Sequence, residues 1–494
     1  MRRGVETRAH AFVSPARLLY LRRVKDSTTL VLSFEAGTLL LEGVGPTEKA
    51  PTAFRWDERV GRWRAPASSY RQVVSELTRG RVAFHDRARG YHQFDFPTKF
   101  LVEPRPYQHE AIREWKAALG CGVVILPTGA GKSLVAQMAI EQVKRSTLVV
   151  VPTLDLMNQW YDLLLSCFEA EVGLIGGGFY EVGALTVTTY ASAFRFMERL
   201  GNAFGLVIFD ECHHLPSGSH RYAADLCIAP YRLGLTATPE RADGGDQLLE
   251  QLIGPTVYRR EAREFAGEYL SDYTVEHVSV RLTTEERARY ESEREIFRRF
   301  LSEKGIGLGS LRGWQMFVAA SARTSEGRRA MMAYRESKRI ALGTDAKLRV
   351  LGELLLRHRR EKVLVFTAEN EMVYRISRRF LIPAITHETN VKERRAWLEA
   401  FNHGDVLALV TSKVLNEGVN IPDASVAVVL SGSGSSREHV QRLGRILRKL
   451  PGKEATLYEV VTEDTTEEQI SRRRGGEQFD AKRQRAPTTA EIPF

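Results

Sequence analysis

The segment Leu126–Ser133 reads LPTGAGKS and contains the residue types that hold phosphate groups in proteins. It follows the apolar run 123–125 and precedes a helical pattern at 134–140, so a buried strand, a glycine-rich turn and a helix are expected in this order. Gly129 and Gly131 allow the backbone to approach phosphates closely, while backbone N–H groups and the positive end of the helix attract the anion. This order predicts a triphosphate-binding loop.

Two side chains of the loop are expected to act on the phosphates and on a metal ion. Lys132 would place its ammonium group on the β- and γ-phosphates, and the Ser133 hydroxyl would bind Mg²⁺. The pattern G-x-x-x-x-G-K-S/T is incomplete, because Leu126 occupies the place of its first glycine. The alternative to a phosphate-binding loop is a glycine-rich turn that binds nothing. The predicted cofactors are ATP and Mg²⁺, and the predicted nucleotide-binding residues of the loop are Pro127, Thr128, Gly129, Ala130, Gly131, Lys132 and Ser133.

A pair of acids follows a later apolar run. Asp210 and Glu211 come after 206–209, which is expected to be another strand of the same parallel sheet. At the carboxyl end of such a strand, Asp210 would hold Mg²⁺, and Glu211 would orient and deprotonate the attacking water. The run DECHH at 210–214 taken alone is also compatible with a surface loop or a metal-ligand cluster, but its place after the phosphate loop favours ATP hydrolysis.

The elements that position these residues alternate between apolar strands and helices in two blocks. The first block has predicted strands at 123–126, 147–151, 185–189, 206–210 and 232–236, with helices near 107–119, 132–144, 155–168 and 190–199. The second has predicted strands at 362–367, 384–386, 407–411, 426–430 and 455–460. Apolar strands separated by helices predict parallel sheets covered on both faces, so the fold class is α/β with two tandem domains.

The remaining segments have other patterns. Hairpin-like alternation occurs at 28–41 and around 54–64, and charged helices are predicted at 285–302, 315–320 and 326–341 around a glycine-rich stretch at 305–309. The predicted organisation is an N-terminal α+β module at 1–95, a first α/β domain at 96–265, a basic helical insert at 281–340, a second α/β domain at 341–470 and a flexible basic tail at 471–494.

Composition limits the class of protein. Hydrophobic residues make up 43% and charged residues 27% of the 494 residues, which is typical of globular proteins that bury a core without disulfides. The four cysteines, Cys121, Cys167, Cys212 and Cys227, form no CxxC pair, so they predict core thiols instead of a zinc ribbon. No apolar run reaches the ~18 residues of a membrane span, and no secretory signal is evident, which predicts a cytoplasmic protein.

Positive charge is concentrated in two regions. The net charge is +10, and residues 1–100 carry 18 Lys and Arg against 10 Asp and Glu, while residues 281–340 carry 14 against 8. Such clusters indicate nucleic acid as the partner, with a solvated basic face as the alternative.

Several segments occur in an order that resembles superfamily 2 helicases and translocases. They are Arg105–Gln108, Pro127–Ser133, Pro152–Trp160, Thr188–Tyr190, Asp210–His213, Thr236–Thr238, Val365–Thr367, Asn416–Asn420 and Gln441–Arg448. The runs FDECHHLP, IAPYRLGLTAT, FLIPAITHET and SGSGSSREHVQRLGRILR are more closely similar to the XPB family of DNA repair and transcription helicases, from about residue 30 to 475. This resemblance implies two RecA-like domains, an N-terminal damage-recognition-like module and a helical thumb that grips DNA. Trp56 and Trp63 of the N-terminal module are expected either to stack on DNA or to belong to the core of the module. For the thumb, the alternative is a packed charged hairpin that does not grip DNA.

The resemblance also implies roles for individual residues. Gln108 would read adenine, and Arg445 and Arg448 would reach the γ-phosphate from the second domain, so that hydrolysis requires the domains to close. By their places in the motifs, Arg105, Gly418 and Gln441 are assigned to the nucleotide, and Thr153, Thr188, Arg241, Thr367 and Thr411 to the nucleic acid. Threonines are also common at strand ends, which is the alternative for each of them.

The expected function is that of an ATP-dependent DNA helicase, 3′–5′ by resemblance, acting in DNA repair on single-stranded or forked DNA. Two departures bear on unwinding: Arg241-Ala242-Asp243 lacks the family's central acid, and Asn416–Asn420 lacks two acids. The alternatives are a duplex DNA translocase and an ATP-gated DNA-binding module that recruits a nuclease without strand separation. RNA is a less favoured substrate, because the overall resemblance is to DNA enzymes.

Overall fold

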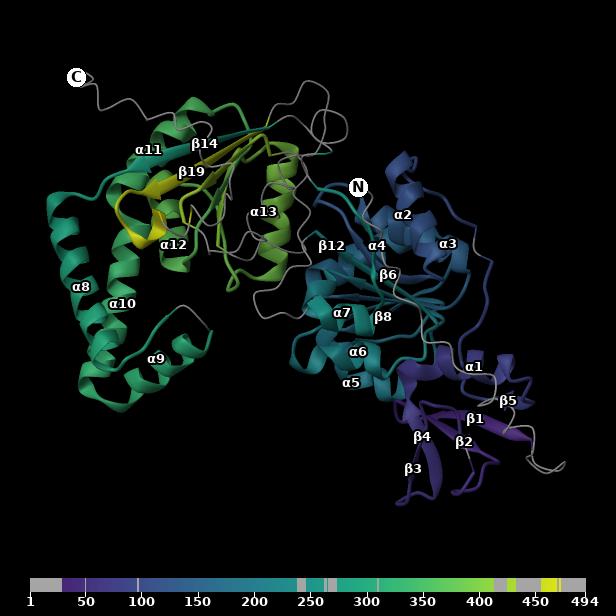
Figure 1. Cartoon of the computed structure of the whole chain (residues 1–494). Coiled ribbons are helices and arrows are strands. Elements are labelled where there is room, and N and C mark those ends of the chain that lie inside the picture. Colours follow the sequence, from purple (N-terminus) through teal and green to yellow (C-terminus); the bar gives the residue numbers. More distant parts are fainter. Residues whose placement is uncertain are drawn as a thin grey trace, which may run out of the picture. The chain divides into compact units, whose positions relative to one another are not determined.

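The chain forms two compact units, shown with their elements in Figure 1. The computed structural model describes residues 29–48, 50–95, 97–237, 246–261, 264, 273–308, 311–412, 424–431, 455–468 and 471. The first unit contains residues up to Leu126 together with Gly131–Arg260, and the second contains residues from Glu261 onward.

A small mixed sheet opens the first unit, in the strand order β3-β4-β2-β1-β5. Its elements are β1 (Leu30–Glu35), β2 (Thr38–Glu42), β3 (Arg55–Asp57), β4 (Arg62–Pro66), the short 3₁₀ turn Ala67–Ser69, α1 (Tyr70–Arg79) and β5 (Phe84–Asp86). The predicted alternation thus corresponds to antiparallel pairs of strands. Trp63 is partly buried against the core of this module, and its indole N–H donates to the carbonyl of Gly45 at 3.2 Å. Trp63 therefore has a packing role in the module.

The larger sheet of the first unit carries the phosphate-loop segment. Its order is β13-β6-β12-β11-β7-β10-β8-β9, and every pair is parallel except β8 with β9. The strands are β6 (Cys121–Ile125), β7 (Thr147–Val151), β8 (Val172–Gly176), β9 (Phe179–Tyr180), β10 (Leu185–Thr189), β11 (Leu206–Asp210), β12 (Tyr231–Thr236) and β13 (Thr256–Arg259). Strands β7, β10 and β11 are buried along their whole length, as expected for parallel strands with both faces covered.

Helices cover the two faces of this sheet, with α3 and α4 on one side and α5 to α7 on the other (Figure 1). They are α2 (Pro106–Ala117), α3 (Lys132–Val143), α4 (Leu154–Cys167), α5 (Tyr190–Leu200), α6 (Tyr222–Asp225) and α7 (Asp246–Leu252), with two short 3₁₀ turns at Cys212–His214 and Gly218–Arg221. Helices α4 and α5 begin at threonine caps: Thr153 accepts from the N–H of Leu156, and Thr189 from that of Ser192, both at 3.2 Å.

The second unit is built on a parallel sheet of order β14-β19-β18-β15-β17-β16. Its strands are β14 (Tyr273–Val280), β15 (Val363–Phe366), β16 (Ala384–Ile385), β17 (Ala408–Thr411), β18 (Val426–Val429) and β19 (Ala455–Thr462), and its helices are α11 (Asp345–Arg357), α12 (Asn370–Phe380) and α13 (Val391–His403). Strand β14 pairs with β19 over eight residues, so the edge strand of this sheet is a segment that precedes the insert in the sequence. The predicted start of this domain at 341 leaves out β14, because polar residues at 274, 276, 277 and 279 interrupt the apolar run by which the other strands were predicted.

The insert between β14 and α11 consists of α8 (Thr284–Glu303), α9 (Leu311–Arg323) and α10 (Ser325–Gly343). Helices α8 and α10 lie side by side in Figure 1, and all three enclose a small core that includes Phe297, Phe300 and Phe317. Ion pairs such as Arg329–Glu293, with N–O distances of 2.6 and 2.8 Å, lie outside that core. Helices α8, α9 and α10 therefore form a unit with its own apolar centre and charged residues outside it.

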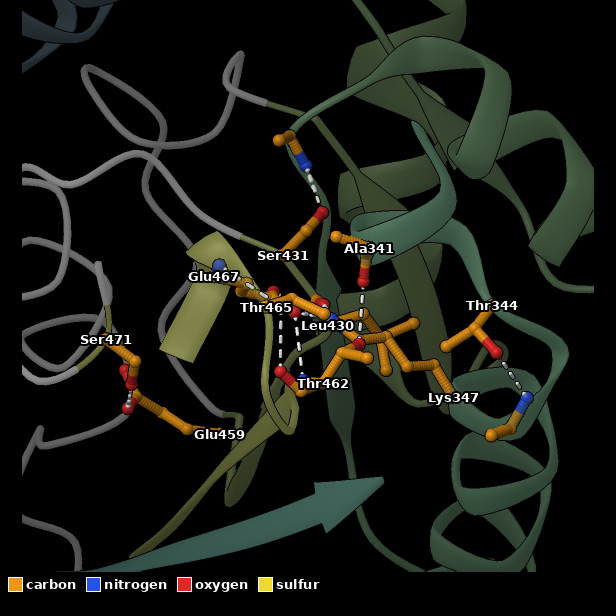
Figure 2. Close-up of polar contacts among 12 residues, drawn as sticks. Ala341, Thr344, Lys347, Leu430, Ser431, Glu459, Thr462, Thr465, Glu467 and Ser471 are labelled. Carbon is orange, nitrogen blue, oxygen red and sulfur yellow. Dashed lines mark hydrogen bonds and ion pairs between the residues drawn. The ribbon is translucent and has the colours of Figure 1, made fainter. Parts of the chain in front are cut away.

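A buried ion pair anchors α11, the helix that follows the insert, to the second sheet (Figure 2). Lys347 of α11 is fully buried, and its ammonium group donates to both carboxylate oxygens of Glu467, at 2.7 and 2.6 Å, and to the carbonyl of Leu430 at the end of β18. Glu467 also accepts from the N–H of Thr462 at 3.0 Å, and the Thr462 hydroxyl donates to the carbonyl of Ala341 in α10 at 2.6 Å. One network therefore joins α10, α11, β18 and β19.

Composition predicts that the chain has no membrane-spanning segment and that its cysteines are core thiols. Within the described part of the chain, no helix is both long and apolar enough to cross a membrane. The four cysteines are free thiols; three are buried, and Cys121 is partly buried at the start of β6.

Candidate active site

The glycine-rich loop lies between the end of β6 and the start of α3. Gly129 and Gly131 have φ values of +87° and +73°, a left-handed conformation that side chains other than glycine rarely adopt. A Cβ atom on Gly131 would lie only 2.5 Å from Nε2 of Gln108. The hydroxyl of Thr128 is buried and has no hydrogen-bond partner within the described residues. A tight glycine cradle with an unsatisfied hydroxyl fits an anionic ligand such as the phosphates of a nucleotide.

The structure brings Lys132 and the acid pair together at the carboxyl ends of β6 and β11. The Lys132 ammonium group lies 3.8 Å from Oε1 of Glu211 and donates to the carbonyl of Leu126 at 3.4 Å. Both charged side chains are nearly buried, with 11% of Lys132 and 12% of Glu211 exposed. One cation and two acids thus lie together largely shielded from solvent, where electrostatic interactions are strong.

Asp210 lies deeper than Glu211. Its Oδ2 accepts from the indole N–H of Trp160 at 2.8 Å, and its Oδ1 accepts from the backbone N–H of Glu211 at 3.0 Å. Burial raises the pKa of Asp210 to about 6; the negative charge of Glu211 also raises it, whereas Lys132 and the Trp160 hydrogen bond oppose the rise.

An added positive charge next to Asp210 and Glu211 would favour the ionised form of the Asp210 carboxylate. The described residues contain no group of three or more His, Cys, Asp or Glu side chains that could enclose a metal. The carboxylates of Asp210 and Glu211 fit Mg²⁺, because this ion usually binds one or two protein carboxylates and completes its coordination shell with water and phosphate oxygens.

Glu211 has an unusual backbone conformation. Its φ is +46°, in the left-handed region that costs a residue with a side chain roughly 1–2 kcal/mol. Its Oε2 lies 3.4 Å from Nδ1 of His213, and the same ring nitrogen lies 3.1 Å from the hydroxyl of Thr236 at the end of β12. The segments that follow β6 and β11 and the end of β12, three neighbouring strands, therefore contribute side chains to one site.

Gln108 lies against the glycine-rich loop and forms two hydrogen bonds with its side chain. Its Oε1 accepts from the N–H of Arg105 at 2.8 Å, and its Nε2 donates to the carbonyl of Gly131 at 3.2 Å. The side chain thus bridges the start of α2 to the phosphate loop, and Gln108 is only 2% exposed.

The threonines assigned to nucleic acid differ in their surroundings. Thr188, Thr367 and Thr411 are buried, and their hydroxyls donate to the carbonyls of residues 175, 369 and 412 at 2.8, 2.9 and 3.2 Å. Thr153 is partly exposed at the start of α4. These contacts favour the alternative, a structural role at a strand end, for the hydroxyls of Thr188, Thr367 and Thr411. The Thr153 hydroxyl oxygen caps α4 by accepting from the N–H of Leu156, while its hydroxyl hydrogen can still donate to a ligand.

Some assigned residues lie outside the described part of the chain. These are Arg241, Gly418, Gln441, Arg445 and Arg448. Their roles therefore stay predictions.

Two aromatic residues that contact Asp210 were not among the predicted site residues. Trp160 in α4 donates to its carboxylate, and the hydroxyl of Tyr190, the first residue of α5, donates to its backbone carbonyl at 3.0 Å. Each is the last residue of a segment on which the family resemblance rests, and that position was the only signal available.

Three family models match the chain. "Type III restriction enzyme, res subunit" matches residues 101–241, "Helicase conserved C-terminal domain" matches 346–449, and "Xeroderma pigmentosum group B helicase damage recognition domain" matches 32–88. The third match covers the small mixed sheet and α1. An ATP-dependent helicase family implies that the chain uses a nucleotide.

Solved structures with low sequence identity share the fold. The helicase domain of Pyrococcus furiosus Hef has a TM-score of 0.50 and 19% identity, and covers 74% of this chain and 97% of its own. Saccharomyces cerevisiae Dbp5 bound to RNA and ADP–BeF₃ has a TM-score of 0.51 and 13% identity, over 76% of this chain and 88% of its own. The α/β fold with two RecA-like domains is therefore confirmed.

Curated relatives are similar over most of the chain. The "DNA 3′-5′ translocase XPB2" of Sulfurisphaera tokodaii is 40% identical over 444 residues, which cover 90% of this chain and 99% of the relative. The "DNA 3′-5′ helicase XPB" proteins of Kineococcus radiotolerans and Mycobacterium tuberculosis are 33% and 32% identical over 75% of this chain, which matches 62% of their own length. The chain accordingly belongs to the XPB family of superfamily 2 helicases and translocases.

Proposed function

We propose that this protein couples ATP hydrolysis to 3′–5′ movement along DNA and to strand separation, in DNA repair. The observation that carries the proposal is the buried arrangement of Lys132, Asp210 and Glu211 at the ends of β6 and β11. The names of the relatives from Sulfurisphaera tokodaii and Mycobacterium tuberculosis support DNA as the substrate and 3′–5′ as the direction.

Each residue of the site has a distinct task in this proposal. Lys132 and the N–H groups of the glycine-rich loop hold the β- and γ-phosphates, while Ser133 and Asp210 hold Mg²⁺. Glu211 takes the proton of the attacking water. Bound MgATP supplies the phosphoanhydride bond whose cleavage drives movement.

Residues of the second unit complete the site in this proposal. Arg445 and Arg448 would stabilise the charge that develops on the γ-phosphate, and Gly418 and Gln441 would contribute to nucleotide binding. An arginine in this role accelerates hydrolysis by on the order of 10³–10⁵. Since these residues belong to the other RecA-like domain, hydrolysis depends on domain closure, and release of the products permits opening.

DNA contacts are proposed for the partly exposed Thr153 at the start of α4 and for the helical insert. The insert's surplus of Lys and Arg supports this, because clustered cations replace the counterions of the phosphate backbone. The logarithm of the affinity for single-stranded DNA is therefore expected to fall linearly with the logarithm of salt concentration. Fluorescence anisotropy between about 50 and 200 mM salt measures the slope, and a flat response would exclude the phosphate backbone as the main contact.

A second candidate, a duplex translocase that does not separate strands, is favoured by two observations. The relative that is 40% identical is named a translocase, and the segment Arg241-Ala242-Asp243 lacks the central acid of the family's pattern. A third candidate, an ATP-gated module that recruits a nuclease, is supported only by the surplus of Lys and Arg in the sequence.

One experiment separates these candidates. Strand displacement is measured on forked DNA with a 3′ or a 5′ tail, beside ATP turnover and removal of a bound protein block from blunt duplex. A helicase is expected to displace strands from the 3′-tailed fork. Turnover with block removal and no displacement selects the translocase, and turnover without either selects the gated module. Absence of DNA-stimulated turnover contradicts all three.

A further inference from the structure

Asp210 is held by aromatic residues from two helices that follow neighbouring strands. Trp160 lies in α4 after β7, and Tyr190 begins α5 after β10. Trp160 is 3% exposed, Tyr190 is 1% exposed and Asp210 is 7% exposed. At this depth water does not readily replace a lost hydrogen bond, so the partners of the carboxylate decide how it is oriented.

Each oxygen of the Asp210 carboxylate accepts one N–H group. Trp160 donates to Oδ2 at 2.8 Å, and the backbone of Glu211 donates to Oδ1 at 3.0 Å. An ionised carboxylate offers about four acceptor positions, so two remain for a cation after these bonds are made. The indole is donor-only and rigid, and therefore fixes the rotation of the carboxylate without competing as a ligand.

We propose that Trp160 is a positioning residue of the magnesium site, whose indole N–H orients the Asp210 carboxylate so that it can bind Mg²⁺ with the nucleotide. This inference rests on the proposed function, because it takes Asp210 as a metal ligand. Partners behind a metal ligand commonly alter metal affinity by about 10- to 100-fold when they are removed.

The chain offers a matched control for the loss of an indole hydrogen bond. Trp115 in α2 is also buried, with 1% exposed, and its N–H donates to the backbone carbonyl of Arg232 at 2.9 Å. Trp115→Phe and Trp160→Phe thus remove the same donor from similarly buried sites in the same unit, but only Trp160 contacts Asp210.

Binding of a fluorescent ADP analogue to the full-length chain, with and without Mg²⁺, tests the inference. For Trp160→Phe the Mg²⁺ concentration at half-saturation is expected to rise about 10-fold, with the metal-free affinity in EDTA unchanged. Trp115→Phe is expected to change neither quantity, and Asp210→Asn is expected to lose most of the Mg²⁺-dependent gain in affinity.

The outcomes separate this inference from the proposed function. An unchanged Mg²⁺ requirement in Trp160→Phe, together with a raised one in Asp210→Asn, overturns the role of Trp160 alone. An unchanged requirement in Asp210→Asn overturns the metal assignment and the inference with it. An equal loss of metal-free affinity in both tryptophan variants shows a general effect on folding and also overturns the positioning role.

Discussion

Replacement of Lys132 by alanine is expected to lower the rate of ATP hydrolysis by a factor of about 10²–10³ or more. The ammonium group is nearly buried beside Glu211, so the charge it would place on the phosphates acts where water screens poorly. Its removal also deletes the cation that lowers the pKa of Asp210, so this pKa rises further above about 6 and the carboxylate becomes a poorer Mg²⁺ ligand. Steady-state turnover with saturating DNA measures the effect.

DNA affinity provides the first control for this variant, since Lys132 is not assigned to DNA and binding is expected to persist. Lys144→Ala provides the second, because Lys144 caps the other end of α3, is half-exposed and pairs with Asp95 outside the site. It is expected to hydrolyse ATP at the wild-type rate. Full turnover by Lys132→Ala would mean that the loop does not hold the reacting phosphates.

The parallel strands were the most predictable part of the fold. β7, β10 and β11 have the bounds that the sequence analysis gives them, because a strand covered on both faces must be an unbroken apolar run. The glycine loop and the acid pair could be placed at one sheet edge for the same reason, since parallel strands end together. Element order therefore predicted the meeting of Lys132 with Glu211.

Edges and long-range contacts were not predictable in this way. β14 and β8 were not assigned, because polar residues, two of them adjacent at 276 and 277, break the apolar run in the first, and the second contains two glycines and borders the short β9. The contact of Trp160 with Asp210 joins residues 50 positions apart, and no pattern within either segment encodes it. The hydroxyls of Thr188, Thr367 and Thr411 could not be assigned from the sequence either. A motif gives the position of a residue, whereas burial determines which groups its side chain can reach.

Lys347→Met is expected to lower the free energy of unfolding of the second unit by about 3–5 kcal/mol, the usual cost of removing one partner from a buried ion pair. The ammonium group is fully buried and bonds to Glu467 and to the carbonyl of Leu430, so methionine leaves an uncompensated carboxylate and an unsatisfied carbonyl (Figure 2). Hydrogen exchange of the β18 and β19 amides measures the change in this unit by itself. The β7 and β11 amides of the first unit are expected to keep their protection.

Two further variants decide whether charge burial is the cause. Lys338→Met removes a lysine from an ion pair of 3.9 Å with Glu369 on the surface of the same unit, and is expected to change stability by less than about 1 kcal/mol. Adding Glu467→Gln to Lys347→Met removes the stranded charge while keeping an acceptor for the N–H of Thr462, so the double variant is expected to be more stable than Lys347→Met alone. If Lys347→Met costs no more than Lys338→Met, the pair does not hold α10, α11 and the two strands together. If the double variant is less stable than Lys347→Met, shape and hydrogen bonding outweigh charge at this site.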